Sequence, residues 1–104
     1  MEFHIIARFH ACAGNEDALE DALYEVHGPT AAEPGCLYHH VFRSIRDEKL
    51  FYVHSRWKDE AAFDAHVVLP HTVRFHKRVA PLLDHPLDVV RVERIEEDLS
   101  SHVT

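Results

Sequence analysis

The fold is decided by residues 36–57, which read CLYHHVFRSIRDEKLFYVHSRW. Aromatic and β-branched residues fill both ends of this stretch, 36–45 and 50–57, and such residues favour β-strands. Between them, residues 46–49 are all charged, which suits the solvent-exposed turn of a hairpin. The stretch therefore predicts two antiparallel strands joined by a short turn.

The residues on the N-terminal side predict a strand followed by a helix. Within residues 2–11 every second residue is apolar, which is the period of a strand with one buried face. A helix is predicted to begin after Asn15, a good N-cap residue, because apolar residues then recur at helical spacing. We expect Gly28-Pro29 to kink or interrupt this helix and Pro34-Gly35 to stop it. The apolar stripe of the helix consists of Ala18, Leu19, Ala22, Leu23 and Val26.

The residues on the C-terminal side predict two short helices and a last strand. Asp59 is an N-cap for the first helix, and Pro70 ends that helix because proline cannot continue its hydrogen bonding. A second short helix follows, and residues 87–95 alternate again as a strand does. Residues 97–104 form a polar C-terminal tail.

The predicted order β-α-β-β-α-(α)-β defines the fold class. With right-handed crossovers it is the ferredoxin-like βαββαβ plan, an α+β fold with one antiparallel sheet, formed by residues 1–96 as a single domain. Helices cover only one face of such a sheet, yet the strands carry apolar residues on both faces. A second copy of the chain is the simplest cover for the other face, so we expect a homodimer.

Composition limits the class of partner and the compartment. The chain has 104 residues and a formal net charge of −7 with histidine neutral, so we expect neither a nucleic acid nor a membrane as a partner. No stretch approaches the roughly 18 apolar residues of a membrane helix. The first four residues lack the basic start of a signal peptide, so we expect a cytoplasmic protein in which Cys12 and Cys36 stay free thiols.

Three blocks of sequence carry a resemblance to a known family. They are Pro29-Thr30-Ala31-Ala32-Glu33-Pro34-Gly35-Cys36-Leu37-Tyr38, then Phe51-Tyr52-Val53-His54-Ser55-Arg56-Trp57, then Ala61-Ala62-Phe63 with His66 and Pro70-His71. In this order and spacing, over roughly residues 2 to 95, the chain resembles the antibiotic-biosynthesis-monooxygenase-like (ABM-like) family.

The resemblance implies a dimeric α/β-barrel, with a pocket between the helices and the sheet of each subunit. Some members of the family oxidise quinol-like or polycyclic phenolic substrates with O2 and without flavin, metal or haem. Others degrade haem, and others isomerise or bind small metabolites. Two positions depart from the family pattern. Ser55 stands where many relatives carry Glu, and Ala7 stands where the haem-degrading branch carries Asn, although Trp57 and His76 have the spacing of that branch's Trp and haem-ligating His.

Trp57, His66 and His71 are the candidate pocket residues. Trp57 is either a large core side chain or the wall of a pocket for a flat aromatic molecule, with its indole N–H free to donate. His66 and His71 are either hydrogen-bonded structural histidines or general bases that remove a phenolic proton. On one continuous helix these two would lie about 140° apart, whereas a break at Pro70 would turn one of them toward the pocket. Further substrate contacts are expected from Tyr52, His54, Ser55 and Phe75.

The pattern of glycine, cysteine and histidine predicts neither a cofactor nor a metal site. The three glycines are isolated, so the glycine-rich loop of flavin- and nicotinamide-binding proteins is absent. There is no His-Glu-x-x-His and no Cys-x-x-Cys sequence. His39 and His40 are adjacent on a strand and therefore point to opposite faces.

We therefore predict a cofactor-independent monooxygenase that oxidises a quinol-like or phenolic aromatic molecule with O2, with His66 or His71 as the base. The alternative is a non-catalytic or isomerase-type protein that binds a small metabolite in the same pocket, which Ser55 favours. A haem-degrading monooxygenase is a third candidate, against which Ala7 counts. The sequence names neither the substrate nor the pathway.

Overall fold

The computed structural model describes residues 1–96, so the expected polar tail at 97–104 lies outside the described residues. The elements follow the predicted order: β1 Phe3–His10, α1 Glu16–Ala31, β2 Cys36–Arg43, β3 Leu50–Trp57, α2 Glu60–Val67, α3 Pro70–Val79, a 3-10 turn η1 Ala80–Leu82, and β4 Asp88–Glu93. The strands form one antiparallel sheet in the order β2-β3-β1-β4. This confirms the predicted ferredoxin-like α+β fold.

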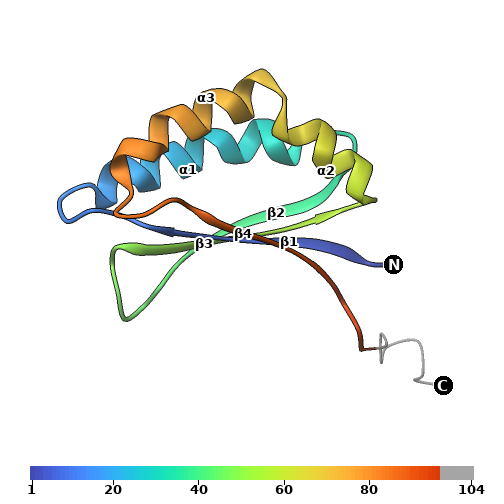
Figure 1. The fold of residues 1–104 in the computed structure, drawn as a ribbon, viewed down its shortest axis with the longest axis horizontal. Coiled ribbons are helices and arrows are strands. Elements are labelled where there is room, and N and C mark those ends of the chain that lie inside the picture. Colours follow the sequence, from blue (N-terminus) through green and yellow to red (C-terminus); the bar gives the residue numbers. More distant parts are fainter. Residues whose placement is uncertain (97–104) are drawn as a thin grey trace.

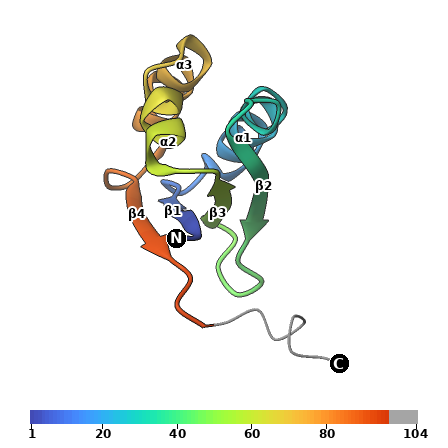
Figure 2. The same cartoon turned by 90° about the vertical axis from the view of Figure 1, so that its right-hand side faces the viewer.

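All three helices lie on one face of the sheet. Figures 1 and 2 show α1 beside the pair α2 and α3, with the sheet beneath them. Because successive residues of a strand point to opposite faces, β1 turns one set of side chains toward the helices, and that set is buried. It consists of Phe3, Ile5, Ala7 and Phe9. The core therefore lies between the helices and the sheet, where Trp57, Phe51 and Leu19 are its largest fully buried apolar side chains.

Helix α1 differs from the prediction at both ends. It runs through Gly28-Pro29 without interruption, because Pro29 lies in the last turn, where its missing N–H leaves only one carbonyl without its helical donor. At the other end the Asn15 side chain makes no capping hydrogen bond, since its backbone (φ −105°, ψ 8°) lacks the extended conformation of most N-caps. The carboxylate of Glu16 instead accepts from the N–H of Gly14.

The loop between α1 and β2 packs tightly against α2. Asp59 caps α2 as predicted, because its Oδ1 accepts from the N–H of Ala62 at 2.8 Å. Gly35 lies against the same turn, and a Cβ added to it would be 2.4 Å from the Cβ of Ala62. Only glycine allows this approach. It brings the loop that carries Glu33 against α2.

The sheet face away from the helices carries exposed apolar side chains. Ile6, Phe42, Val90 and Val92 are between 36% and 51% exposed, and they come from β1, β2 and β4. Within residues 1–96 no helix is long and apolar enough to cross a membrane.

Candidate active site

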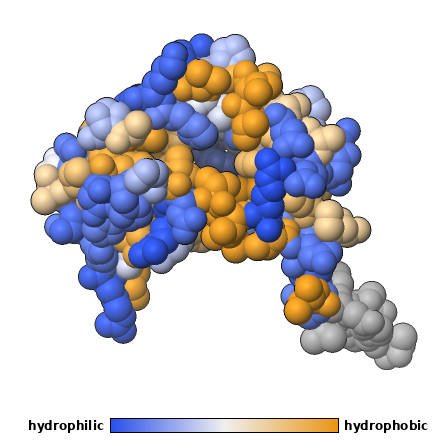
Figure 3. Space-filling model, viewed as in Figure 1, coloured by the Kyte–Doolittle hydropathy of each residue, from blue (hydrophilic) through white to orange (hydrophobic). Residues whose placement is uncertain are grey.

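A cavity of about 70 Å³ lies in the core between the helices and the sheet. Every α-helix and strand of the sheet-and-helix core contributes to its walls, including Trp57 on β3, Phe63 and His66 on α2, Phe75 on α3 and Val89 on β4. Figure 3 shows a hollow near the middle of this face, with hydrophobic surface along much of its edge and hydrophilic residues along the rest. A largely apolar space with a few polar groups is the usual form of a small-molecule site.

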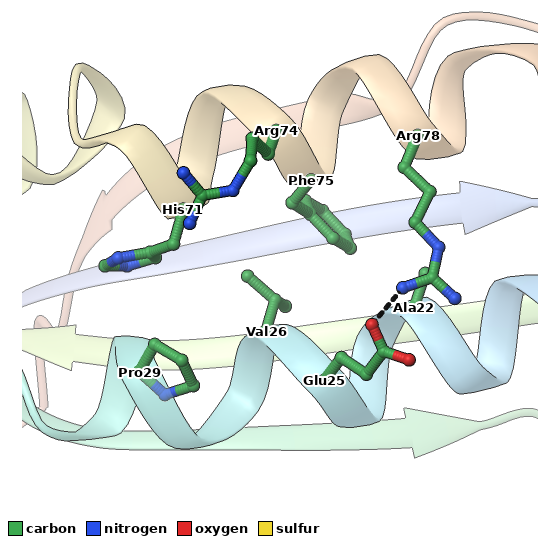
Figure 4. Close-up of a pocket in the computed structure, with 8 residues that line it drawn as sticks. All are labelled: Ala22, Glu25, Val26, Pro29, His71, Arg74, Phe75 and Arg78. Carbon is green, nitrogen blue, oxygen red and sulfur yellow. Dashed lines mark hydrogen bonds and ion pairs between the residues drawn. The ribbon is translucent and has the colours of Figure 1, made fainter.

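A larger cleft of about 300 Å³ opens between α1 and α3 (Figure 4). Phe75 and Val26 line both the cleft and the buried cavity. In Figure 4 the ring of Phe75 points from α3 toward α1, and the ion pair between Arg78 and Glu25 joins the two helices. The Phe75 side chain therefore lies at the boundary between the cleft and the core cavity.

Glu33 joins the two candidate histidines. Its Oε2 lies 2.7 Å from Nδ1 of His66 and 2.8 Å from Nε2 of His71. The chain breaks between α2 and α3, and both histidines contact Glu33. The sequence had suggested that the break would turn only one of them toward the pocket. His66 lines the cavity and His71 lines the cleft, so Glu33 links the two spaces.

The contacts to Glu33 orient both imidazole rings. A carboxylate only accepts hydrogen bonds, so each ring donates to Glu33 from the nitrogen that touches it. In the neutral ring the other nitrogen, Nε2 of His66 or Nδ1 of His71, is then an acceptor. An imidazole held in this way by a carboxylate is the arrangement of a general base.

The same three side chains offer the donors of a metal site. One carboxylate oxygen of Glu33 and one nitrogen each of His66 and His71 lie within 4.8 Å of one another, and residues 1–96 hold no other such group of three. Zn²⁺ and Fe²⁺ accept two imidazoles and a carboxylate. The sequence-based expectation of no metal site used motif spacing alone, and these donors come from three separate segments.

Trp57 is 2% exposed and its indole is already paired. Nε1 donates to Oγ of Ser55 at 3.0 Å, so the expectation of a free indole N–H is wrong. The two residues are two apart on β3 and therefore share a face of the sheet. The Trp57 ring also lies 4.8 Å, centre to centre, from the His66 ring. Ser55 thus holds the indole against the candidate base, where many relatives carry Glu.

The wall of the cavity also includes the buried His39, which pairs with His27 on α1. Nδ1 of His39 lies 2.8 Å from Nδ1 of His27. Burial, together with repulsion from His27, His66 and His40, lowers the pKa of His39 to about 4. His39 is therefore neutral at pH 7. It lines the cavity while His40 is exposed, as their predicted opposite orientation requires.

Two of the predicted substrate contacts lie elsewhere. Tyr52 and His54 alternate on β3 with Ser55 and Trp57, so they point away from the helices and line neither the cavity nor the cleft. Nε2 of His54 lies 2.9 Å from Nδ1 of His4 on the open face of the sheet. We therefore place these two side chains outside the candidate site, and Ser55 and Phe75 inside it.

The two positions that matter for haem chemistry line the same cavity. Ala7 and His76 both contribute to its wall. Burial lowers the pKa of His76, and the neighbouring His66 lowers it further. At the position where the haem-degrading branch is expected to carry Asn, this chain offers only the methyl group of Ala7.

Comparisons with known proteins identify the family. A family model described as "Antibiotic biosynthesis monooxygenase" matches residues 2–78. The chain is 38% identical over 65 residues to "Putative monooxygenase YcnE" of Bacillus subtilis, which covers 62% of this chain and 68% of that protein. It is 29% identical over 93 residues to "Putative monooxygenase Rv0793" of Mycobacterium tuberculosis, covering 89% and 91%.

Solved structures agree with this result. The crystal structure of PA3566 from Pseudomonas aeruginosa is similar with a TM-score of 0.85 and 30% identity, covering 91% of this chain and 95% of that one. The structure of Rv0793 from Mycobacterium tuberculosis is similar with a TM-score of 0.87 and 27% identity, covering 93% and 98%. Since the family model spans most of the sequence, this chain belongs to the antibiotic biosynthesis monooxygenase family.

Proposed function

We propose that this protein is a cofactor-independent monooxygenase that oxidises a quinol-like or phenolic aromatic molecule with O2. The observation that carries the proposal is the contact of Glu33 with both His66 and His71, beside the buried ring of Trp57. Family membership and the monooxygenase names of two relatives support it. The proposal needs a pocket for a flat ring and a base, and it assigns both to residues of this chain.

The pocket suits an aromatic ring once the two spaces join. Specific ligand sites usually begin at about 300 Å³, which the cleft reaches and the cavity does not. Rotation of Phe75 would open the cavity to the cleft, because its side chain lines both. A substrate ring would then lie against Trp57, with its hydroxyl near the acceptor nitrogen of His66. Aromatic rings pack favourably in offset or edge-to-face arrangements.

The reaction balances with O2 as the oxidant. His66 removes the proton of a phenolic hydroxyl, and the anion transfers electrons to O2 so that a carbon–oxygen bond forms at a ring carbon. Loss of water from that adduct leaves the quinone. A phenol plus O2 thus gives a quinone and one water, and each product receives one of the two atoms of O2. The role of Glu33 is to stabilise the imidazolium that forms, which an adjacent carboxylate does by charge attraction.

The experiment measures oxygen uptake with a panel of phenols and hydroquinones, corrected for their spontaneous oxidation. With ¹⁸O2 the product should gain one labelled atom. We expect Glu33→Gln and His66→Asn to lower the rate by about 100-fold, the usual size of a general-base contribution. His85→Gln is the matched control, because His85 is an exposed loop residue that lines neither the cavity nor the cleft. Wild-type rates in both site variants would refute the assigned base.

The alternative remains a protein that isomerises or binds a small metabolite in the same pocket. Ser55 favours it, because the carboxylate that many relatives place there is replaced by a hydroxyl that holds Trp57. A base that removes and returns a proton needs no oxygen. Substrate conversion without oxygen uptake would support this alternative, as would quenching of Trp57 fluorescence by ligands that are never converted.

We further propose that the protein is a homodimer that forms through the open face of its sheet. Exposed apolar residues on three strands support this, because a solvated protein rarely leaves such a face uncovered. A twofold axis would place the same face of both subunits together. Sedimentation at micromolar concentration tests it, and a monomer there would contradict the proposal.

A cytoplasmic location is proposed on the state of the cysteines. Cys12 and Cys36 are both free thiols. Burial, together with the charge of Glu33, raises the pKa of the Cys36 thiol to about 11. A protonated thiol packed beside the core cluster of Phe3 and Trp57 is an apolar side chain rather than a nucleophile. Fractionation of the cells that make the protein tests the location.

A further inference from the structure

Thr30 is a buried polar residue whose hydroxyl has no partner. Its side chain lies in the last turn of α1 and is 2% exposed. Among residues 1–96, Oγ1 of Thr30 makes no hydrogen bond. Burying a hydroxyl without a partner destabilises a protein, and natural proteins rarely do so without a reason. The position calls for an explanation, because valine would fill the same space at no such cost.

Thr30 is part of the cavity wall. Thr30 lines the cavity together with Ser55, His39, His66 and Thr72. Each of these four neighbours has a hydrogen-bond partner within the protein. The partner of Thr72 is Nδ1 of His66, at 3.3 Å. Thr30 is therefore the fully buried polar group of the cavity that the folded chain leaves unpaired.

We infer that the hydroxyl of Thr30 binds an oxygen atom of the ligand that occupies the cavity. A hydroxyl both donates and accepts, so it can pair with a phenolic hydroxyl, a phenolate or a quinone carbonyl. Thr30 is then a specificity-determining residue, which favours a ring that carries oxygen over a hydrocarbon ring of the same shape. The inference rests on the proposed function in one respect only, namely that the ligand is aromatic.

The substitution Thr30→Val separates a ligand-binding role from a structural one. If the hydroxyl serves only the ligand, the ligand-free variant should be at least as resistant to heat as the wild type. Thr72→Val is the matched control, because it removes a hydroxyl of equal burial that does have a partner. We expect Thr72→Val to lower the melting temperature and Thr30→Val to leave it unchanged or raise it. A clearly lowered melting temperature of Thr30→Val would overturn the inference.

Binding is measured with 1-naphthol and 1-methylnaphthalene, which differ by a hydroxyl in place of a methyl group. Trp57 is the sole tryptophan and lines the cavity, so its fluorescence reports occupancy. We expect Thr30→Val to lower the affinity for 1-naphthol by about fivefold to tenfold, which is the range that one hydrogen bond contributes. The affinity for 1-methylnaphthalene should stay within about twofold, and Thr30→Ser should restore most of the 1-naphthol affinity.

The outcomes distinguish this inference from the proposed function. If Thr30→Val binds 1-naphthol as tightly as the wild type, the role of Thr30 is refuted and the aromatic pocket stands. If the affinities for the two probes fall equally, the substitution has changed the shape of the cavity, and the role of the hydroxyl is refuted. If the wild type binds neither probe, the aromatic pocket fails and the inference fails with it.

Discussion

Acid should destabilise this protein through His39, and the substitution His39→Gln should remove that sensitivity. His39 is 7% exposed, and its neighbours are the ring of His27 on α1, His66 on α2 and His40 beside it on β2. Burial and these three rings all disfavour its charged form, so its pKa falls to about 4. Glutamine retains a polar side chain but does not titrate.

The sign and size follow from the difference between the folded and unfolded states. Because the folded pKa lies below the unfolded value of about 6.5, the unfolded chain takes up the proton first as the pH falls. Stability from this residue is complete above pH 6.5 and is lost between pH 6.5 and 4. At about 1.4 kcal/mol per tenfold change in proton affinity, the total loss is about 3 kcal/mol, of which about 2 kcal/mol is lost by pH 5.

Urea unfolding at pH 7.5 and pH 5, at one protomer concentration, measures this difference. The wild type should lose about 2 kcal/mol more than His39→Gln between the two pH values. His40→Gln is the control, because His40 is the adjacent but exposed residue, and it should keep the wild-type pH dependence. An equal loss in wild type and His39→Gln, within about 0.5 kcal/mol, would refute the assignment of a neutral buried His39.

Three further predictions concern the loop, the open face and the metal donors. Gly35→Ala should destabilise the fold by about 1–3 kcal/mol because its Cβ would overlap Ala62. Gly28→Ala is the control, which should be neutral or stabilising because nothing lies near its added Cβ. Thermal melting compares the two variants. Val90→Asp should convert the proposed dimer to monomers in sedimentation, since it places a charge on the apolar face, and an unchanged dimer would show that the interface lies elsewhere. Removing divalent cations with EDTA should leave oxygen uptake unchanged, whereas activity lost to EDTA and restored by Zn²⁺ or Fe²⁺ would make Glu33, His66 and His71 metal ligands.

Much of the fold could be predicted from the sequence because its signals are local. The hairpin, the buried face of β1 and the Asp59 cap each depend on residues within a few positions of one another. The expected interruption of α1 at Gly28-Pro29 does not occur, because Pro29 lies in the last turn, where its missing N–H costs one hydrogen bond only. Tyr52 and His54 were placed with the pocket by family likeness, and strand alternation sends both to the other face.

The sequence by itself determined the order of elements and the antiparallel sheet, and it singled out Trp57, His66 and His71 as candidate pocket residues. Only the tertiary structure showed that Glu33 holds both histidines, across 33 and 38 positions of sequence. It also showed that Thr30 is buried without a partner. Periodicity reveals which face of an element is buried, because that is set by neighbours along the chain. Which polar groups meet inside the core depends instead on how α1, α2 and α3 dock on the sheet, and no local pattern records that.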